Sequence, residues 1–217
     1  MNLVILGATG ATGRLLVDQA LDRGHEVVAY VRRPDALPAR TGLRVVGGQL
    51  TDEPGLRSAL AGADAVLCAI GPTGVKELFG ADLMQRTLPT VTAAMSAAGV
   101  RRLVLLSAFG VGSTLSAASP LAKVAFGTAM RSVYRDKEVA EARLAASGVD
   151  VTTVYPVVLT NGPPDDTAVV RDAATVQRIS GLPKVSRATV AKAMLDAVED
   201  AGSVGRRLLV SSAGTRR

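Results

Sequence analysis

The chain has 217 residues, of which 48% are hydrophobic, and it carries a formal charge of +6 at pH 7 with an isoelectric point near 10.0. This length suits one domain with a full hydrophobic core, and no apolar run approaches the ~20 residues that a membrane-spanning helix needs. The arginine pairs are scattered and aromatic residues make up only 3%, so we expect neither a nucleic-acid nor a membrane partner.

Short apolar strands alternate with helical stretches along the whole chain. Strands rich in Val, Ile and Leu are predicted at 3–6, 26–31, 44–46, 65–69, 102–107, 151–155 and 207–210. Helices are predicted at 12–23, 53–61, 81–98, 121–147 and 187–201. This alternation predicts one α/β domain over 1–217, a doubly wound (Rossmann) and mostly parallel sheet with helices on both faces. The segment 161–166 is predicted to be a loop.

The first predicted strand ends in a glycine-rich turn that opens the first helix. Such a turn lets the backbone approach a pyrophosphate and aims helix N–H groups at it. The spacing is one residue longer than in the usual dinucleotide fingerprint, and a glycine turn that binds nothing is the alternative. Its position at the start of a βαβ chain favours a dinucleotide. The predicted contacts are Gly7, Thr9, Gly10, Ala11, Thr12 and Gly13.

The end of the second predicted strand bears on the choice of dinucleotide. NAD-binding proteins usually carry an acidic residue there, which bonds the ribose 2′-hydroxyl. This strand is followed instead by Arg32 and Arg33, whose guanidinium groups can grip a 2′-phosphate. The alternative is a solvated arginine pair. We therefore predict NADP(H), with Arg32 favoured over Arg33.

Cys68 is the only cysteine and cannot form an internal disulfide, which fits a reducing compartment. The apolar run at 3–6 has no basic region before it and reads as a strand, not as a secretory signal. We therefore expect a cytoplasmic protein, monomer or homodimer, that acts on a small molecule. His25 is expected at the surface, and no residues have metal-ligand spacing.

Several motifs together resemble the atypical short-chain dehydrogenase/reductases, in particular the small NAD(P)H-binding group with biliverdin-IXβ reductase/flavin reductase and the NmrA-like proteins. The matching segments are 7–13, 31–32, 37–38, 64–66, 107–109, 147–150 and 185–187. The resemblance places Ser107 at the family's active-site serine position. It implies further cofactor contacts at Gln49, Leu50, Ala69, Ile70, Gly71, Tyr155 and Pro156. One departure is Gly48, where relatives usually carry Asp.

Typical members of the larger superfamily use a tyrosine and a lysine four residues apart on one helix for acid–base chemistry. Here Tyr134 and Lys137 are three apart and Val133 stands where the tyrosine would be, so the full motif is absent. Lys137 falls on an apolar helix stripe, from which it either extends along its stem or contacts the cofactor ribose. Tyr134 lines the pocket as proton donor or simply packs. Asp136, Glu138 and Glu141 are expected to form surface ion pairs.

The loops near 109–130 and 156–180 are predicted to supply the substrate pocket. Their candidate substrate residues are Phe109, Val111, Phe126, Met130 and Val158, which can equally be core or interface. The leading hypothesis is an NADPH-dependent reductase of a flavin, quinone, tetrapyrrole or ketone, with Ser107, Lys137 and Tyr134 as catalytic candidates. One alternative is a catalytically silent NADP(H) sensor of the NmrA-like type. Another is an epimerase, isomerase or dehydratase that recycles the nucleotide.

Overall fold

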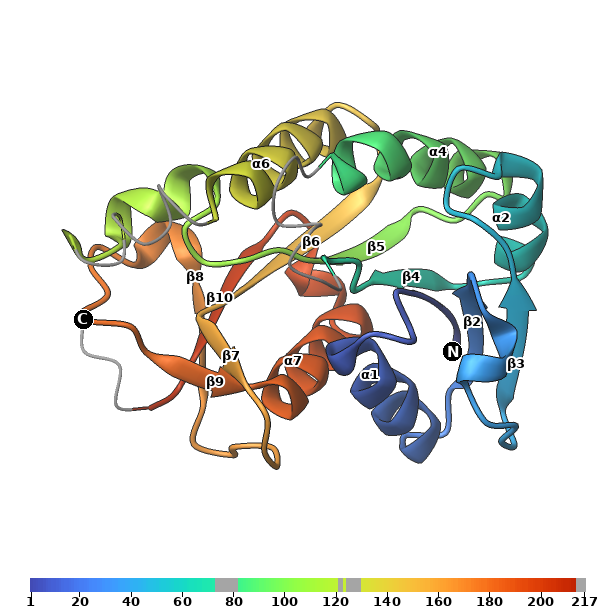
Figure 1. Cartoon of the computed structure of the whole chain (residues 1–217), viewed down its shortest axis with the longest axis horizontal. Helices are drawn as coiled ribbons and strands as arrows, with labels where there is room; N and C mark the ends of the chain where they lie inside the picture. Colours follow the sequence, from blue (N-terminus) through green and yellow to red (C-terminus); the bar gives the residue numbers. More distant parts are fainter. Residues whose placement is uncertain (73–81, 121–122, 124–129, 214–217) are drawn as a thin grey trace.

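A mostly parallel sheet runs through the molecule in the computed structural model, which describes residues 1–72, 82–120, 123 and 130–213 (Figure 1). In this part of the chain, eight strands follow the order β3-β2-β1-β4-β5-β6-β10-β8. They are β1 (Asn2–Leu6), β2 (Glu26–Val31), β3 (Leu43–Gly47), β4 (Ala65–Cys68), β5 (Arg102–Leu106), β6 (Asp150–Pro156), β8 (Val169–Asp172) and β10 (Arg207–Ser211). β8 pairs antiparallel with β10, and the predicted doubly wound, mostly parallel sheet is confirmed.

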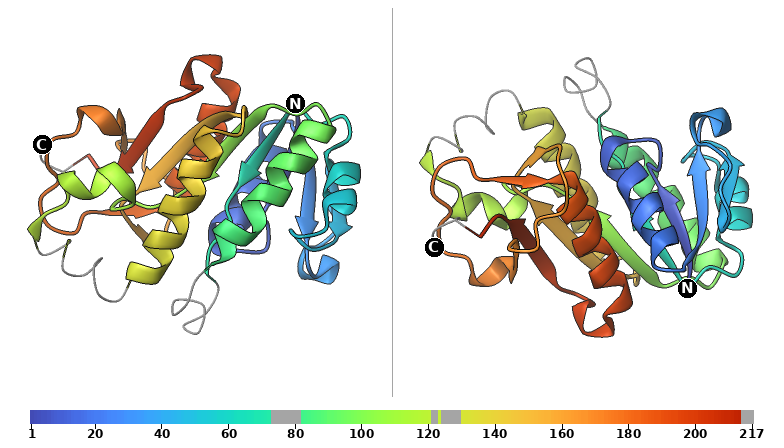
Figure 2. Two further views of the ribbon diagram at one scale, coloured as in Figure 1. Left: turned by 90° about the horizontal axis from the view of Figure 1, so that it is seen from above. Right: turned by 90° about the horizontal axis from the view of Figure 1, so that it is seen from below.

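Helices cover both faces of this sheet, as Figures 1 and 2 show. One face carries α1 (Ala11–Asp22) and α7 (Arg187–Glu199). The other carries α2 (Glu53–Leu60), α4 (Leu83–Ala97) and α6 (Arg131–Ala145). Because strand side chains alternate between the faces, β1 contributes Leu3 and Ile5 to one buried cluster and Val4 and Leu6 to the other. None of the helices in the described ranges is long and apolar enough to cross a membrane.

The seven predicted strands are all present, whereas three short ones were missed. These are β8 and the pair β7 (Val158–Thr160) and β9 (Lys184–Ser186), which form a separate two-stranded parallel sheet. These short segments contain Thr, Ser or charged residues and so lack the continuous Val, Ile and Leu run that marks the other strands. The predicted helix at 121–147 is observed as α6 from Arg131. Residues 121–122 and 124–129 lie outside the described part.

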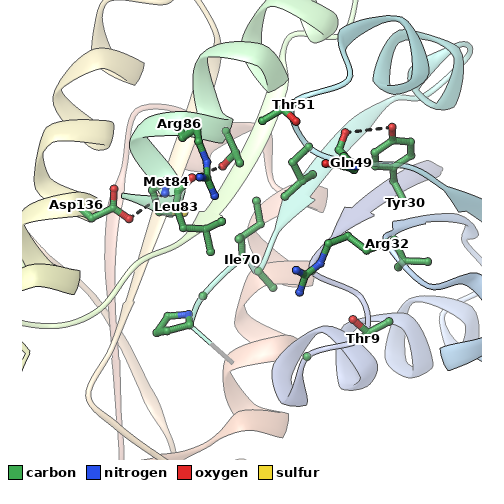
Figure 3. A pocket seen from close by; sticks show the side chains of 18 of the residues that line it. Thr9, Tyr30, Arg32, Gln49, Thr51, Ile70, Leu83, Met84, Arg86 and Asp136 are labelled. Carbon is green, nitrogen blue, oxygen red and sulfur yellow. Dashed lines mark hydrogen bonds between the residues drawn. The ribbon is translucent and has the colours of Figure 1, made fainter. Parts of the chain in front are cut away.

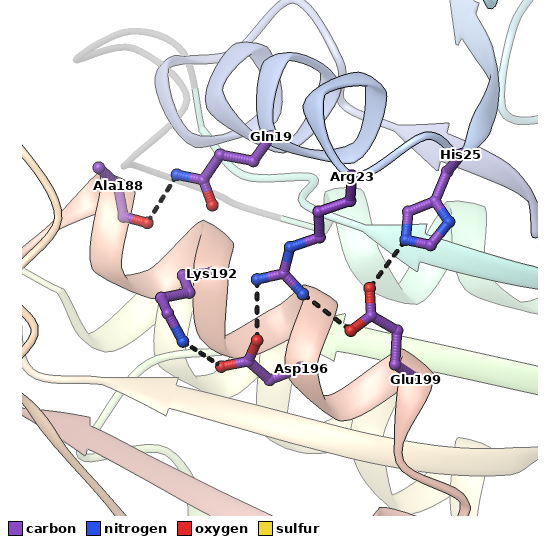
Figure 4. Close-up of polar contacts among 7 residues, drawn as sticks. All are labelled: Gln19, Arg23, His25, Ala188, Lys192, Asp196 and Glu199. Atoms are coloured by element: carbon purple, nitrogen blue, oxygen red, sulfur yellow. Dashed lines mark hydrogen bonds and ion pairs between the residues drawn. The ribbon is translucent and has the colours of Figure 1, made fainter.

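Ion pairs join α1 to α7 on the outside of the sheet (Figure 4). Arg23 at the end of α1 binds Asp196 and Glu199 at 2.8 and 2.9 Å, and His25 Nε2 lies 2.8 Å from Glu199 Oε1. Gln19 adds a hydrogen bond to the main-chain oxygen of Ala188 at 3.0 Å. His25 is thus a link between β2 and α7, and the cluster fixes the helix that begins at the glycine turn.

We expect Glu199→Gln to lower the free energy of unfolding at pH 7 by less than about 1 kcal/mol, because these pairs are partly exposed. Burial opposes ionisation, but hydrogen bonds and charge from His25 and Arg23 outweigh it and hold the pKa of Glu199 below its usual value. The stabilisation is present above the unfolded-state pKa and is lost as pH falls through the lower, folded-state value. Urea unfolding from pH 7 to pH 3 should show the wild type converging on the variant. A constant difference would contradict this.

Candidate active site

The glycine turn is packed so closely that two of its glycines have no room for a side chain. Gly7 has φ of 80°, and a Cβ there would lie 2.7 Å from the carbonyl oxygen of Ala69. A Cβ on Gly13 would overlap the carbonyl oxygen of Gly7. Gly13 therefore serves the packing of α1 on the turn. It lines neither of the hollows described below.

The start of α1 is open to an anion. Its N-cap is Gly10, no side chain caps it, and its first turn holds no acidic residue. Its N–H groups and the positive end of its dipole therefore face the turn without a carboxylate to neutralise them. Arg14 fixes the surrounding loops by donating to the main-chain oxygens of Thr9 at 3.2 Å and Ala36 at 2.8 Å. This cradle fits a pyrophosphate.

A first hollow of about 610 Å³ extends from the turn toward β2 and α4, and we call it the arginine hollow (Figure 3). Arg32, which directly follows β2, and Arg86 on α4 reach into it. Arg33 is exposed and lines neither hollow. The other predicted cofactor residues in its wall are Gly7, Thr9, Gly10, Gln49, Leu50, Ala69, Ile70, Gly71 and Lys137.

Tyr30 gives a steric reason for the departure at Gly48. A Cβ at Gly48 would overlap the Tyr30 hydroxyl, which donates to the main-chain oxygen of Gln49 at 3.3 Å. The buried Tyr30 thus occupies the space that a side chain at position 48 would need. Sequence reasoning missed it because an aromatic residue in a strand is ordinarily core.

A second hollow of about 750 Å³ extends from the turn along the ends of β5 and β6, and we call it the apolar hollow. It shares Thr9, Gly10 and Lys137 with the arginine hollow, so the two adjoin at the turn. The predicted residues in its wall include Ala11, Thr12, Ser107, Phe109, Met130, Tyr134, Pro156 and Val158. Leu182 and Arg187 line it as well and were not predicted.

Of the described substrate candidates, Val111 does not stand in this wall. Val111 has no exposed surface and is part of the core. It lies after β5, between Gly110 and Gly112, which both have positive φ. Phe126 lies outside the described residues.

Lys137 lies where the two hollows meet. It is only 6% exposed, on the stripe of α6 that also buries Val133, Ala140 and Leu144, as predicted. Its Nζ donates to the main-chain oxygen of Leu106 at 3.1 Å, and an ammonium group has three donors. Burial lowers the pKa of Lys137, with Glu141 the largest opposing influence.

Tyr134 lines the apolar hollow, but its hydroxyl donates to the main-chain oxygen of Phe109 at 3.2 Å. Burial raises the pKa of Tyr134 to about 12. An acid–base tyrosine needs a pKa lowered toward neutrality. The environment of Tyr134 shifts it the other way.

Behind the apolar hollow, Glu141 connects three strands to α6. Its carboxylate accepts from the hydroxyl of Ser107 through Oε1 and from that of Tyr155 through Oε2, the latter at 2.5 Å. Arg207 in turn donates to the Tyr155 oxygen from Nε and Nη2 at 3.2 and 3.0 Å. The expectation that Glu141 forms a surface ion pair is wrong. Tyr155 is 1% exposed and lines neither hollow, although the neighbouring Pro156 lines the apolar one.

Asp136 is a second carboxylate for which the surface expectation is wrong. It is 3% exposed and accepts from the main-chain N–H groups of Met84 and Gln85 at 2.9 and 3.0 Å. These N–H groups belong to the first turn of α4. Asp136, on α6, therefore caps that helix, and its negative charge stabilises the positive end of the helix dipole. Among the described residues, no group of three or more His, Cys, Asp or Glu side chains is arranged to hold a metal ion.

A family model described as NAD(P)H-binding matches residues 7–201. The chain belongs to this NAD(P)H-binding family. The predicted resemblance is thereby confirmed at the level of the family, and the cofactor is a nicotinamide dinucleotide. The cradle at Gly7 and Gly13 and the uncapped start of α1 fit such a group.

Among curated family relatives, a (4-alkanoyl-5-oxo-2,5-dihydrofuran-3-yl)methyl phosphate reductase of Streptomyces griseus is 39% identical over 110 residues. The match covers 50% of this chain and 35% of that protein. The chain spans only 33% to 52% of the length of several such relatives.

Several solved structures share the fold. A short-chain dehydrogenase/reductase of Veillonella parvula in complex with NADP has a TM-score of 0.83 at 19% identity, covering 100% of this chain and 96% of that one. The anaerobilin reductase ChuY of Escherichia coli O157:H7 has a TM-score of 0.78 at 24% identity, with 100% of both chains covered. At such identities the likeness shows the Rossmann fold alone.

Proposed function

We propose that this protein is an NADPH-dependent reductase of a small, largely apolar acceptor such as a flavin, quinone, tetrapyrrole or ketone. The observation that carries the proposal is the pair of adjoining hollows at the glycine turn. One holds Arg32 and Arg86, and the other has mostly apolar walls beyond Lys137. A dinucleotide phosphate and an apolar acceptor are the ligands that suit these two walls.

The chain's own residues bind and orient in this proposal. The turn and the start of α1 hold the pyrophosphate, and Lys137 offers N–H donors to the ribose. When bound, the cofactor supplies the hydride. Phe109, Met130 and Val158 present apolar surface to the acceptor and exclude water. Because burial raises the pKa of Tyr134 to about 12, we assign the proton to water. The reductase of Streptomyces griseus among the relatives supports this class of reaction.

The test is the loss of absorbance at ~340 nm when NADPH is incubated with the protein and a panel of flavins, quinones, biliverdins and ketones. We expect turnover with at least one acceptor. Tight binding of NADP(H) without turnover on any of them would instead favour a catalytically silent sensor. That second function is favoured by the hydroxyls of Ser107 and Tyr134, which donate to Glu141 and to the Phe109 main chain.

Arg32→Ala should weaken NADPH binding by about 10- to 100-fold and leave NADH binding nearly unchanged, because only NADPH has a 2′-phosphate to pair with a guanidinium. The matched control is Arg33→Ala. This substitution removes the same charge, but Arg33 lines neither hollow. Titration of each variant with both dinucleotides measures this. Equal losses for the two dinucleotides in Arg32→Ala would exclude a 2′-phosphate contact.

A further inference from the structure

A directed chain of hydrogen bonds runs behind the apolar hollow from β10 to the end of β5. An arginine has donors only, so the Tyr155 oxygen accepts from Arg207 and its single proton points to Glu141. The Arg207 guanidinium also lies over the Tyr155 ring, 5.0 Å from its centroid. The direction of donation is therefore set from the arginine end.

The carboxylate of Glu141 is the common acceptor of this chain. Lys137 lies one turn earlier on α6 and interacts electrostatically with it, and Arg207 lies beyond Tyr155. A carboxylate can only accept, and its Oε2 takes the Tyr155 proton. Ser107, which meets the other carboxylate oxygen, must then give its only proton to Glu141.

A serine hydroxyl whose proton is committed has only lone pairs left. Ser107 lines the apolar hollow, so the side that it turns to a ligand accepts hydrogen bonds and cannot donate them. We propose that Glu141 is a positioning residue that makes Ser107 an acceptor toward the hollow, where it receives an N–H of the cofactor's carboxamide. This inference rests on the proposed dinucleotide site and deepens it. It also removes Ser107 as the donor to a substrate oxygen.

Two dinucleotides test the direction of this bond without turnover. NADP⁺ carries a carboxamide with two N–H donors, whereas its 3-acetylpyridine analogue has a methyl ketone, which only accepts. We expect the wild type to bind NADP⁺ about tenfold more tightly than the analogue, the scale of one buried hydrogen bond. Equilibrium titration of each dinucleotide gives the ratio of the dissociation constant of the analogue to that of NADP⁺, which should be about ten for the wild type.

Glu141→Gln should remove the preference for NADP⁺ or reverse it. A glutamine can keep its carbonyl on the Tyr155 hydroxyl and donate its N–H to Ser107, which frees the Ser107 proton to meet an acceptor. We expect the ratio to fall to about one or below. Glu138→Gln is the matched control, because Glu138 is exposed on the same helix and loses the same charge. It should keep the wild-type ratio.

A double-mutant cycle shows whether Glu141 acts through Ser107. Ser107→Ala should bring the ratio to about one, and adding Glu141→Gln to it should change nothing more. Thermal unfolding checks that each variant is folded. If Glu141→Gln does not fold, the ratio for Ser107→Ala alone shows whether Ser107 contacts the carboxamide. An unchanged ratio in Glu141→Gln, or in Ser107→Ala, overturns this inference while leaving the dinucleotide site intact. Failure of the wild type to bind either dinucleotide overturns the proposed function as well.

Discussion

Gly13→Ala is expected to abolish detectable NADPH binding and to lower the free energy of unfolding by about 2–4 kcal/mol. The added Cβ would overlap the carbonyl oxygen of Gly7 and lie 2.8 Å from the Cα of Ala8. Both neighbours are main-chain atoms, so the strain is relieved only if α1 moves off the turn. That movement would disperse the N–H groups on which we expect the pyrophosphate to be bound.

Gly71→Ala separates this effect from the general cost of replacing a glycine. Gly71, unlike Gly13, borders both hollows, but its φ lies outside the left-handed region and a Cβ there would meet nothing within 4 Å. Its free energy of unfolding should stay within about 0.5 kcal/mol of the wild type or rise slightly. Chemical denaturation and NADPH titration measure both variants. Wild-type stability and affinity in Gly13→Ala would show that the turn is not packed in this way.

Local sequence predicted the fold and the turn well because their signals lie within a few residues. Gly7, Gly10 and Gly13 follow an apolar strand directly, and the strand period of two and the helix period of 3.6 are short-range patterns. The same reasoning failed for Asp136 and Glu141. Each shares its helix with several Lys and Arg residues, and we therefore expected surface pairing. Their actual partners are Met84, Gln85, Ser107 and Tyr155, on other elements.

Tyr155 and Pro156 show a second limit. The resemblance placed both at the cofactor, but successive residues of a strand point to opposite faces. Pro156 lines the apolar hollow, whereas Tyr155 meets Glu141. Arg32 and Arg33 divide in the same way, since only the first reaches the arginine hollow. A motif of two adjacent residues identifies the segment, and the backbone geometry decides which of the two contributes to the site.

Lys137→Met should weaken NADP(H) binding by about 10- to 100-fold while leaving the cofactor-free protein at least as stable as the wild type at pH 7. The lost affinity is that of a charged hydrogen bond to the ribose. The retained stability has a separate cause. Lys137 is buried and burial lowers its pKa, so an apolar side chain of similar length removes the cost of desolvating an ammonium group at the expense of the bond to Leu106.

The stability difference between the wild type and Lys137→Met should depend on pH in one direction. Burial lowers the folded-state pKa of Lys137 below the unfolded value of ~10.4. Between these two values the unfolded chain binds more protons than the folded one, so the wild type gains stability relative to the variant as pH rises. Below the folded-state pKa the full cost of the buried charge applies. Lys192→Met is the control, because Lys192 is about half exposed and pairs with Asp196. Urea unfolding from pH 7 to pH 10.5 should show the free energy of unfolding of the wild type approaching that of Lys137→Met, with no such approach for Lys192→Met. If the wild-type and Lys137→Met free energies stayed parallel with pH, the Lys137 ammonium would not be desolvated in the folded protein.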